Sequence, residues 1–226
     1  RLDRVLNLYF GQEQRAKKST MARNISRKSF LQLGTGLAGS LALDPFKNDF
    51  NTSAMDNTSK IVRGDLILRG IPSSGEKLPA IGMGTWLTFD AGNSETRRKD
   101  LTEVLRIFNK NGGKLIDSSP MYGSSERVAG DLMTDLKIRK HTFIATKVWT
   151  TGEADGIAQM QESIQKMQAG VMDLMQVHNL VDAHIHLPTL RKWKAEGKVR
   201  YIGITHYQVS AYPELMELIK KEKLDF

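Results

Sequence analysis

Four residues, Asp117, Tyr122, Lys147 and His178, carry the side chains that protonation of a carbonyl oxygen requires. A tyrosine is a weak acid with an ordinary pKa of about 10, and a nearby ammonium group stabilises the tyrosinate and lowers that pKa. A carboxylate beside the lysine keeps the ammonium charged and fixes its direction, and a histidine can orient and polarise a carbonyl group. Together these types predict a general-acid set that protonates the oxygen of a carbonyl group while its carbon receives hydride.

Each of these residues has an ordinary explanation when it is taken alone. A single Asp at a strand end usually caps a loop, a single Lys usually lies on a solvated face, and a single Tyr usually belongs to the core. Their placement decides between the two explanations. Asp117, Lys147 and His178 each stand at or near the end of a short apolar stretch. Tyr122 follows in the loop after Asp117, and Thr205-His206 comes at the end of the next such stretch.

The elements that must position these side chains alternate between strands and amphipathic helices. Ser94 is a plausible N-cap for a helix whose apolar face holds Leu101, Val104, Leu105 and Phe108, and Gly112-Gly113 ends it. The further predicted helices are Ser125–Asp135, Asp155–Gln168 with its stripe of Ile157, Met160, Ile164 and Met167, Pro188–Glu196 before Gly197, and Pro213–Lys221. The predicted strands are Ile81–Trp86, Lys114–Ser118, Thr142–Val148, Met172–His178 and Tyr201–Thr205, with Leu224–Phe226 opening another. A β-hairpin, Val62–Pro72 and Lys77–Ala80 around Ser73–Glu76, precedes them.

This alternation predicts an α/β fold, in which crossover helices connect the strands of a parallel sheet. An open doubly wound sheet and a closed barrel both fit the periodicity. In a barrel the chemistry lies at the carboxyl ends of the strands, and here four consecutive strands each place a polar group at that end. We therefore predict an (α/β)8 TIM barrel, of which about five and a half strand–helix units are present.

The order Asp117, Tyr122, Lys147, His178, with the local sequences around each, resembles the aldo/keto reductase family. Gly82-Met83-Gly84-Thr85-Trp86 and Tyr201-Ile202-Gly203-Ile204-Thr205-His206 resemble it as well, so that the resemblance covers residues 61–226. It implies the (α/β)8 barrel, NADP(H) bound without a Rossmann domain, and reversible reduction of aldehydes or ketones to alcohols. The implied partner is thus a small-molecule carbonyl or alcohol substrate.

The resemblance also implies a role for each residue. Tyr122 would be the proton donor, Lys147 would tune it, Asp117 would orient the set, and His178 would position the carbonyl group. Trp86 and Trp149 would line the substrate pocket together with His178. The residues implied along the cofactor are Gly84, Thr85 and Asp117 at the nicotinamide ribose and Thr205 and His206 at the carboxamide.

Two departures from the family pattern bear on the cofactor. Thr205-His206 stands where the family often has Ser-Asn, although Thr and His can both hydrogen-bond. The family's groups for the adenosine 2′-phosphate would lie beyond residue 226, so that NADPH rather than NADH rests on the resemblance alone. We expect the chain to be C-terminally truncated, and residues 1–226 alone to be inactive and poorly soluble. A nucleotide-binding regulatory subunit of the same fold and an inactive fragment are the alternative functions.

Residues 1–60 are expected to form an N-terminal extension. Residues 21–42 resemble a secretory signal, with a basic start, the apolar stretch 30–43 and small residues before a cut after Ala42. Residues 26–31 resemble a twin-arginine signal with Lys28 in place of the second Arg, which predicts a periplasmic location. A disordered basic tail on a cytoplasmic protein is the alternative. Residues 44–60 read as a linker, and the domain follows at 61–226.

Several classes of function are disfavoured. Most of the net charge of +8 lies in residues 1–50, which hold nine Lys or Arg and four Asp or Glu, and no basic run is interleaved with aromatic residues, so nucleic-acid binding is not expected. The 14-residue apolar stretch is too short to span a bilayer and predicts no stable membrane anchor. The Gly-x-Gly-x-x-Gly at 34–39 follows no strand, so we do not interpret it as a Rossmann motif. No metal is expected at His184 and His186, because zinc usually needs three or four protein ligands; the ten methionines are interpreted as packing residues.

Overall fold

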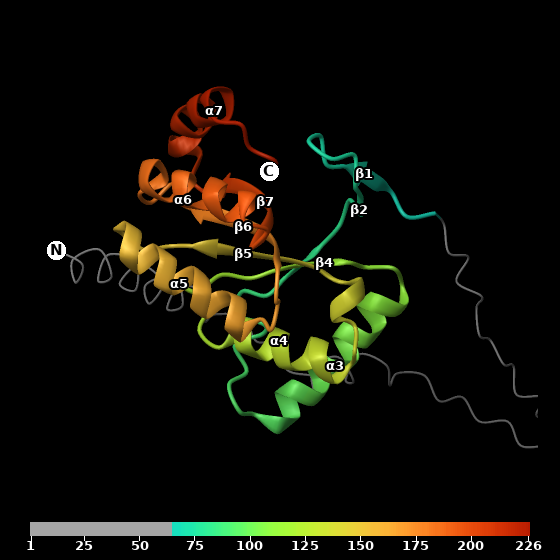
Figure 1. Ribbon diagram of the computed structural model, residues 1–226. Coiled ribbons are helices and arrows are strands. Elements are labelled where there is room, and N and C mark those ends of the chain that lie inside the picture. The colour runs from blue at the N-terminus through green and yellow to red at the C-terminus, as the bar shows by residue number, and fades with distance from the viewer. Residues whose placement is uncertain (1–64) are drawn as a thin grey trace, which may run out of the picture. The chain divides into compact units, whose positions relative to one another are not determined.

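The computed structural model describes residues 65–226, which form a five-stranded parallel sheet with its crossover helices, preceded by an antiparallel hairpin. Figure 1 shows this arrangement. The strands are β1 (Leu68–Gly70), β2 (Lys77–Pro79), β3 (Met83–Gly84), β4 (Leu115–Asp117), β5 (Phe143–Val148), β6 (Met172–His178) and β7 (Val199–Thr205). The helices are α3 (Glu95–Lys110), α4 (Ser125–Asp135), α5 (Glu153–Lys166), α6 (Ala183–Ala195) and α7 (Tyr212–Lys221), with 3-10 turns η1 (Arg139–His141) and η2 (Val209–Ala211).

The sheet order β3–β4–β5–β6–β7 follows the order of the strands in the chain. Parallel neighbours need a crossover, and α3, α4, α5 and α6 supply the four crossovers in turn. An open doubly wound sheet would reverse direction at a switch point, and no reversal occurs in this sheet. The described residues therefore form consecutive strand–helix units of an α/β barrel, as the sequence predicts.

The two faces of the sheet pack against different partners. On one face, side chains such as Ile144 and Ile202 join a large core with the helices. On the other face, Ala145 and Leu174 pack with Ile71 and Leu78 of the hairpin segment. Because side chains alternate along a strand, residues separated by two positions share a face. Lys147 therefore continues the face of Ala145, away from the helices.

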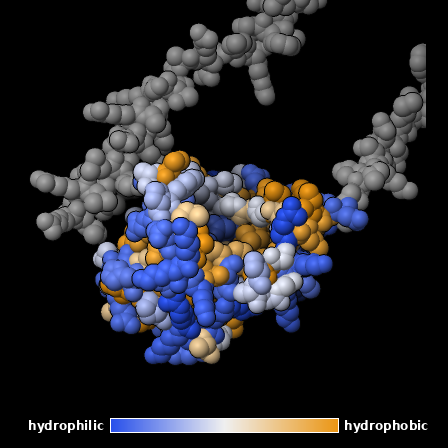
Figure 2. Space-filling view, turned by 90° about the horizontal axis from the view of Figure 1, so that it is seen from above, coloured by the Kyte–Doolittle hydropathy of each residue, from blue (hydrophilic) through white to orange (hydrophobic). Residues whose placement is uncertain are grey.

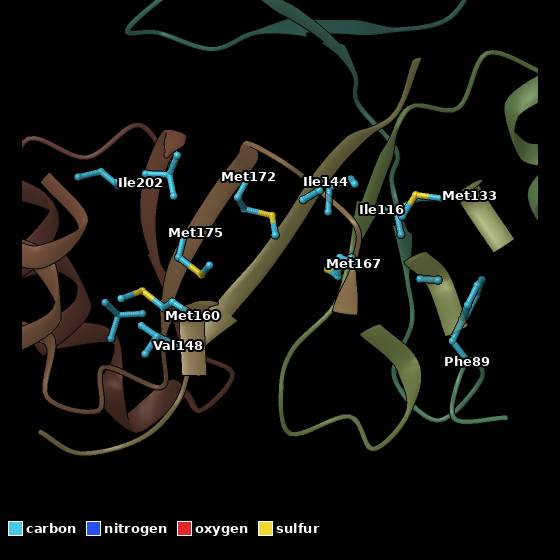
Figure 3. Packing of buried hydrophobic residues seen from close by; sticks show 14 of the residues in the cluster. Phe89, Ile116, Met133, Ile144, Val148, Met160, Met167, Met172, Met175 and Ile202 are labelled. Atoms are coloured by element: carbon cyan, nitrogen blue, oxygen red, sulfur yellow. The ribbon is translucent and has the colours of Figure 1, made fainter. Parts of the chain in front are cut away.

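Methionine fills much of the helix-side core. Met133, Met160, Met167, Met172 and Met175 are fully buried, and Figure 3 shows their side chains between the strands and the helices. The flexible thioether suits the irregular spaces between a twisted sheet and its helices. The interpretation of these methionines as packing residues is confirmed, and the predicted stripe of α5 is confirmed with them.

Two predicted features of the helices differ from the structure. Ser94 caps α3 as predicted, but Val104 is 44% exposed while Leu101 and Leu105 are buried. The apolar stripe of α3 is therefore narrower than its sequence suggests. Helix α6 begins at Ala183 rather than at Pro188, so that Pro188 lies inside it.

The early start of α6 has a packing cause. Proline usually marks a first turn because it lacks an N–H. Here the preceding turn is held by other contacts: His186 is buried and its Nε2 lies 2.8 Å from the carbonyl oxygen of Thr150. His184 and His186 therefore lie within a helix and not in a loop. Among residues 65–226 no group of three or more His, Cys, Asp or Glu side chains could hold a metal ion.

The last residues of the chain lie along β7. The N–H groups of Asp225 and Phe226 donate to the carbonyl oxygen of Ile202, at 3.0 and 3.3 Å, and Ile204 N–H donates to Phe226 O at 3.3 Å. Asp225 also accepts the N–H of Ile202 through Oδ2 at 2.9 Å. The predicted further strand is thus present as main-chain pairing to β7, although too short to form a regular strand.

Part of the surface is apolar. Figure 2 shows hydrophobic areas beside hydrophilic ones on the face seen from above. On α7, Tyr212, Met216 and Ile219 are about half exposed. No helix within residues 65–226 is long and apolar enough to cross a bilayer. The predicted signal segment at 21–42, the linker and the glycine motif at 34–39 lie outside the described residues.

Candidate active site

The carboxyl ends of β4, β5 and β6 bring Asp117, Lys147 and His178 together on one face of the sheet. Asp117 stands in register with Ala145, Lys147 with Gln176, and His178 with Thr205. Period-two alternation turns Lys147 and the residues two positions before it to the same side. The predicted convergence of the three side chains thus follows from strand register and pleat.

Lys147 and Asp117 form a largely buried ion pair. Lys147 Nζ donates to Asp117 Oδ2 at 2.5 Å and to the carbonyl oxygen of Ser118 at 2.6 Å. The lysine side chain is 5% exposed and the aspartate side chain 30% exposed. Gln176 Nε2 lies 3.4 Å from Asp117 Oδ1, at the limit for a hydrogen bond. The ammonium group is therefore held in one direction by strand ends on either side of it.

The pKa of Asp117 results from opposed effects. Burial of the carboxyl group raises this pKa above its ordinary value and is the largest influence. The Lys147 ammonium and the Gln176 amide lower it and offset part of the rise. The pair thus holds a carboxylate in surroundings that would otherwise favour its neutral form.

The loop after β4 brings Tyr122 over this ion pair. Lys147 Nζ lies 5.3 Å from the centroid of the Tyr122 ring. The ring of His178 meets it edge-on with centroids 6.4 Å apart, and the ring of Trp86 lies tilted at 6.5 Å. All four predicted catalytic residues therefore lie within one small region.

Two turns fix the course of that loop. Tyr122 N–H donates to Ser119 O at 3.0 Å, and Gly123 has a positive φ of 60°. Asp90, before α3, accepts both the N–H of Ser124, at 2.9 Å, and its hydroxyl, at 2.7 Å. A Cβ at Gly123 would lie 2.6 Å from the Asp90 carboxyl carbon. The position of Tyr122 thus depends on a glycine that permits close approach to Asp90.

The direction in which the Tyr122 pKa is shifted corrects the sequence-based expectation. We expect from the residue types alone that Lys147 lowers this pKa. In the structure burial of the phenol raises the pKa, and the Asp117 charge raises it further. The physical reason is that Lys147 is already bound to Asp117, so that its charge is largely compensated where the phenol lies. A raised pKa keeps the phenol protonated at neutral pH.

His178 is held neutral. Its pKa is lowered from 6.5 to about 4, first by burial and then by the charges of Lys147 and His206. A neutral imidazole donates through one ring nitrogen and accepts through the other. Nδ1 is buried and has no hydrogen-bond partner among the described residues.

The residues predicted along the cofactor differ in accessibility. Gly84 stands in register with Asp117, and a Cβ there would meet no atom within 4 Å, so the end of β3 borders open space. The side chain of Thr85 is fully buried and donates to Ser118 Oγ at 2.9 Å. Trp86 is 57% exposed and stands at the rim beside Tyr122.

The remaining predicted residues lie at the same end of the sheet. Thr205 ends β7, and its carbonyl oxygen accepts the N–H of Asn179 at 2.8 Å. His206 Nδ1 accepts the N–H of Gln208 at 3.0 Å, and its ring stacks on Tyr207. Trp149 follows Lys147 by two positions; the ring contacts of Tyr122 within the described residues are with Trp86 and His178.

Three residues of this region escaped the sequence analysis. Gln176 lies opposite Lys147 in register, and its period of two from His178 could have revealed it. Ser119 Oγ and the Oδ1 of Asn179 are buried without a hydrogen-bond partner among the described residues. Each directly follows a site strand or its first residue, which is a weak signal in sequence alone.

A model of the aldo/keto reductase family matches residues 80–226. Over 147 residues the chain is 30% identical to the methylglyoxal reductase YeaE of Escherichia coli, covering 62% of this chain and 50% of that protein. It is 28% identical over 151 residues to a glyoxal reductase of Bacillus subtilis, covering 64% and 51% respectively. The chain spans about half the length of these curated relatives.

Solved structures show the same fold. An aldo-keto reductase of Klebsiella pneumoniae, crystallised with NADPH, has a TM-score of 0.57 and 23% identity over 70% of this chain and 55% of its own. A thermostable aldo-keto reductase crystallised with the inhibitor epalrestat has a TM-score of 0.59 and 24% identity, with 70% and 60% covered.

Proposed function

The chain belongs to the aldo/keto reductase family, and we propose that it carries the acid–base residues of an NADP(H)-dependent oxidoreductase that interconverts a small aldehyde or ketone and its alcohol. The observation that carries the proposal is the placement of the Tyr122 phenol between the buried Lys147–Asp117 pair and the edge of the neutral His178 ring. A protonated phenol, a fixed ammonium and a neutral imidazole are the groups that protonation of a carbonyl oxygen needs.

Features of this end of the sheet fit a nicotinamide nucleotide. The end of β3 at Gly84 borders open space beside Asp117. Ser119 Oγ and Asn179 Oδ1 are buried polar atoms with no partner among the described residues, which a polar ligand group could satisfy. Neighbours of this fold were crystallised with NADPH or NADP. The residues we propose to hold the nucleotide are Gly84, Thr85, Asp117, Thr205 and His206.

In the proposed reaction NADP(H), when bound, supplies or accepts the hydride. Tyr122 donates its phenolic proton to the carbonyl oxygen, and the neutral His178 donates a hydrogen bond to the same oxygen and so sets its direction. Lys147 stabilises the negative charge that remains on the phenol, because its Nζ is held close to that ring. Trp86 covers one side of the substrate at the rim, and Trp149 is proposed to form another wall of the pocket.

The test follows NADPH absorbance in the presence of methylglyoxal, glyoxal and a panel of larger aldehydes. The first two are chosen because the relatives are named for them. We expect Tyr122→Phe to lower the rate at least about 10³-fold, a loss of about 4 kcal/mol, without loss of NADPH binding. Tyr212→Phe, a matched change at an exposed tyrosine of α7, should leave the rate unchanged.

Two outcomes would contradict this assignment. A Tyr122→Phe variant that keeps more than about a tenth of the rate, a loss below about 1.4 kcal/mol, would show that the phenol is not the proton donor. Tight retention of NADPH with no turnover of any aldehyde would favour the regulatory alternative. Full-length relatives with the same substitution give the positive control for the assay.

A further inference from the structure

The chain just beyond β5 is held by a side chain where a neighbouring strand would otherwise be needed. Trp149 N–H donates to Gln159 Oε1 at 2.6 Å, and Gln159 Nε2 donates to Trp149 O at 3.1 Å. A primary amide offers one acceptor and one donor side by side, as a peptide group does. Gln159, on α5, therefore extends β5 by one residue and fixes both polar groups of the Trp149 peptide unit.

Helix α6 holds the same loop from the other side. Gly152 N–H donates to Asp182 Oδ2 at 2.8 Å, and His186 Nε2 lies 2.8 Å from Thr150 O. A carbonyl oxygen only accepts, so Nε2 of His186 carries the proton and donates. Gly156 on α5 makes room for this ring, since a Cβ there would lie 2.6 Å from His186 Nδ1.

The loop that presents Asp182 is itself held in an uncommon conformation. Asn179, Leu180 and Asp182 have φ values of 53°, 57° and 46°, a region that non-glycine residues rarely adopt. Such strain persists only where the surroundings fix it, and it concentrates at functional sites. Here Asn179 N–H is bonded to Thr205 O at 2.8 Å, and the Leu180 side chain is buried in the core. The strain keeps Asp182 aimed at Gly152.

The held loop starts next to a catalytic side chain. Trp149 follows Lys147 by two positions, and the Gln159 bonds continue the extended chain to Trp149, so the pleat turns both side chains toward the same face. That face carries Asp117 and His178 as well. The direction of the Trp149 ring thus depends on how firmly residues 149–152 are held.

We infer that Gln159, Asp182 and His186 are positioning residues that fix the loop 149–152, and with it the Trp149 wall of the pocket that admits the carbonyl substrate. The inference rests on the proposed function for the identity of the pocket. The interlock itself rests on four hydrogen bonds that need no ligand. A looser wall lowers substrate binding and leaves the proton transfer from Tyr122 intact.

The first experiment measures hydrogen exchange at the Trp149 main-chain N–H and the spectrum of its indole N–H by nuclear magnetic resonance, without cofactor or substrate. Gln159→Met keeps the length of the side chain and removes both bonds. Gln161→Met makes the same change on the exposed side of α5. We expect Trp149 N–H to exchange at least roughly tenfold faster in Gln159→Met and at an unchanged rate in Gln161→Met. Equal exchange in the two variants, at equal global stability, would overturn the inference.

The second experiment separates KM from kcat with small and large aldehydes. Asp182→Leu removes the acceptor for Gly152 N–H, whereas Asp182→Asn retains one and should restore wild-type behaviour. Asp182→Leu and Gln159→Met should each raise KM for the carbonyl substrate roughly fivefold, with kcat and KM for NADPH within about twofold. Faster exchange with an unchanged KM would overturn the assignment to the pocket wall.

The two experiments keep the proposals apart. If the wild-type chain reduces no aldehyde, the proposed function fails, while exchange at Trp149 still decides whether Gln159 holds the loop. If the wild type is active and Asp182→Asn behaves as Asp182→Leu does, the interlock through Gly152 is refuted and the proposed function stands.

Discussion

The Lys147–Asp117 pair should be more costly to break than to remove. Lys147→Met leaves a carboxylate that is 30% exposed, and Asp117→Asn leaves an ammonium group that is 5% exposed and bonded only to Ser118 O. Loss of one partner from a buried ion pair typically costs about 3–5 kcal/mol. We expect Asp117→Asn to lie near the upper value, about 4 kcal/mol, and Lys147→Met below it, at about 2–3 kcal/mol, because water reaches the aspartate.

The double variant should be far more stable than the two losses combined. With both charges removed, the remaining cost is chiefly the lost hydrogen bond to Ser118 O, about 1 kcal/mol. The predicted coupling is therefore about 4–6 kcal/mol, measured as the non-additive part of the free energy of unfolding in urea at one pH and salt concentration. The exposed pair Arg106–Glu103 on α3 is the control and should show little coupling. Additive losses, or coupling no larger than that of the control, would refute the claim that the pair is buried and unscreened.

Three further predictions follow from the geometry. The pKa of Tyr122 should rise in Lys147→Met and fall in Asp117→Asn, since the first leaves the Asp117 charge uncompensated; resonances of labelled tyrosine, assigned with Tyr122→Phe, measure it, and a pKa unchanged in both variants would show that the pair and the phenol are not coupled. Burial raises the pKa of Glu126 above its ordinary 4.5, so the folded state binds the extra proton and stability falls as pH rises above 4.5; Glu126→Gln, which keeps the bond from Thr146, should flatten this part of the pH–stability curve, and an unchanged curve would contradict the shift. Gly130→Ala should destabilise by about 1–3 kcal/mol despite the higher helix propensity of Ala, because its Cβ would overlap Lys166 O and lie 2.8 Å from Met167 Cα; Gly70→Ala, with 4.0 Å of space, is the control, and a stabilised Gly130→Ala would sink the argument.

Much of the fold was predictable because it depends on local period. The bounds of α4 and β6 match the predicted ranges, and the caps at Ser94 and Gly197 are those that the sequence indicates. The start of α6 was not predictable from Pro188, because the turn before it is held by a contact between His186 and Thr150, which lie 36 positions apart.

The candidate site divides in the same way. The convergence of Asp117, Lys147 and His178 follows from their positions at strand ends, which sequence alone reveals. The pKa shift of Tyr122 depends on which charge the ammonium group already binds, and residue types do not contain that information. Gln159 was invisible because its role consists of bonds to a main chain, for which any sequence offers a partner.

The pairing of Leu224–Phe226 with β7 has a consequence for how the protein behaves in concentrated solution. An uncovered parallel edge offers N–H and C=O groups to any extended chain and so promotes self-association into aggregates. Here the Asp225 carboxylate occupies the N–H of Ile202, and main-chain bonds occupy its carbonyl oxygen. Gly203 permits that approach, because a Cβ there would lie 2.8 Å from Phe226 O. A bulkier residue at position 203 would therefore act on colloidal stability, by opening β7 to foreign strands, without altering any group of the catalytic site.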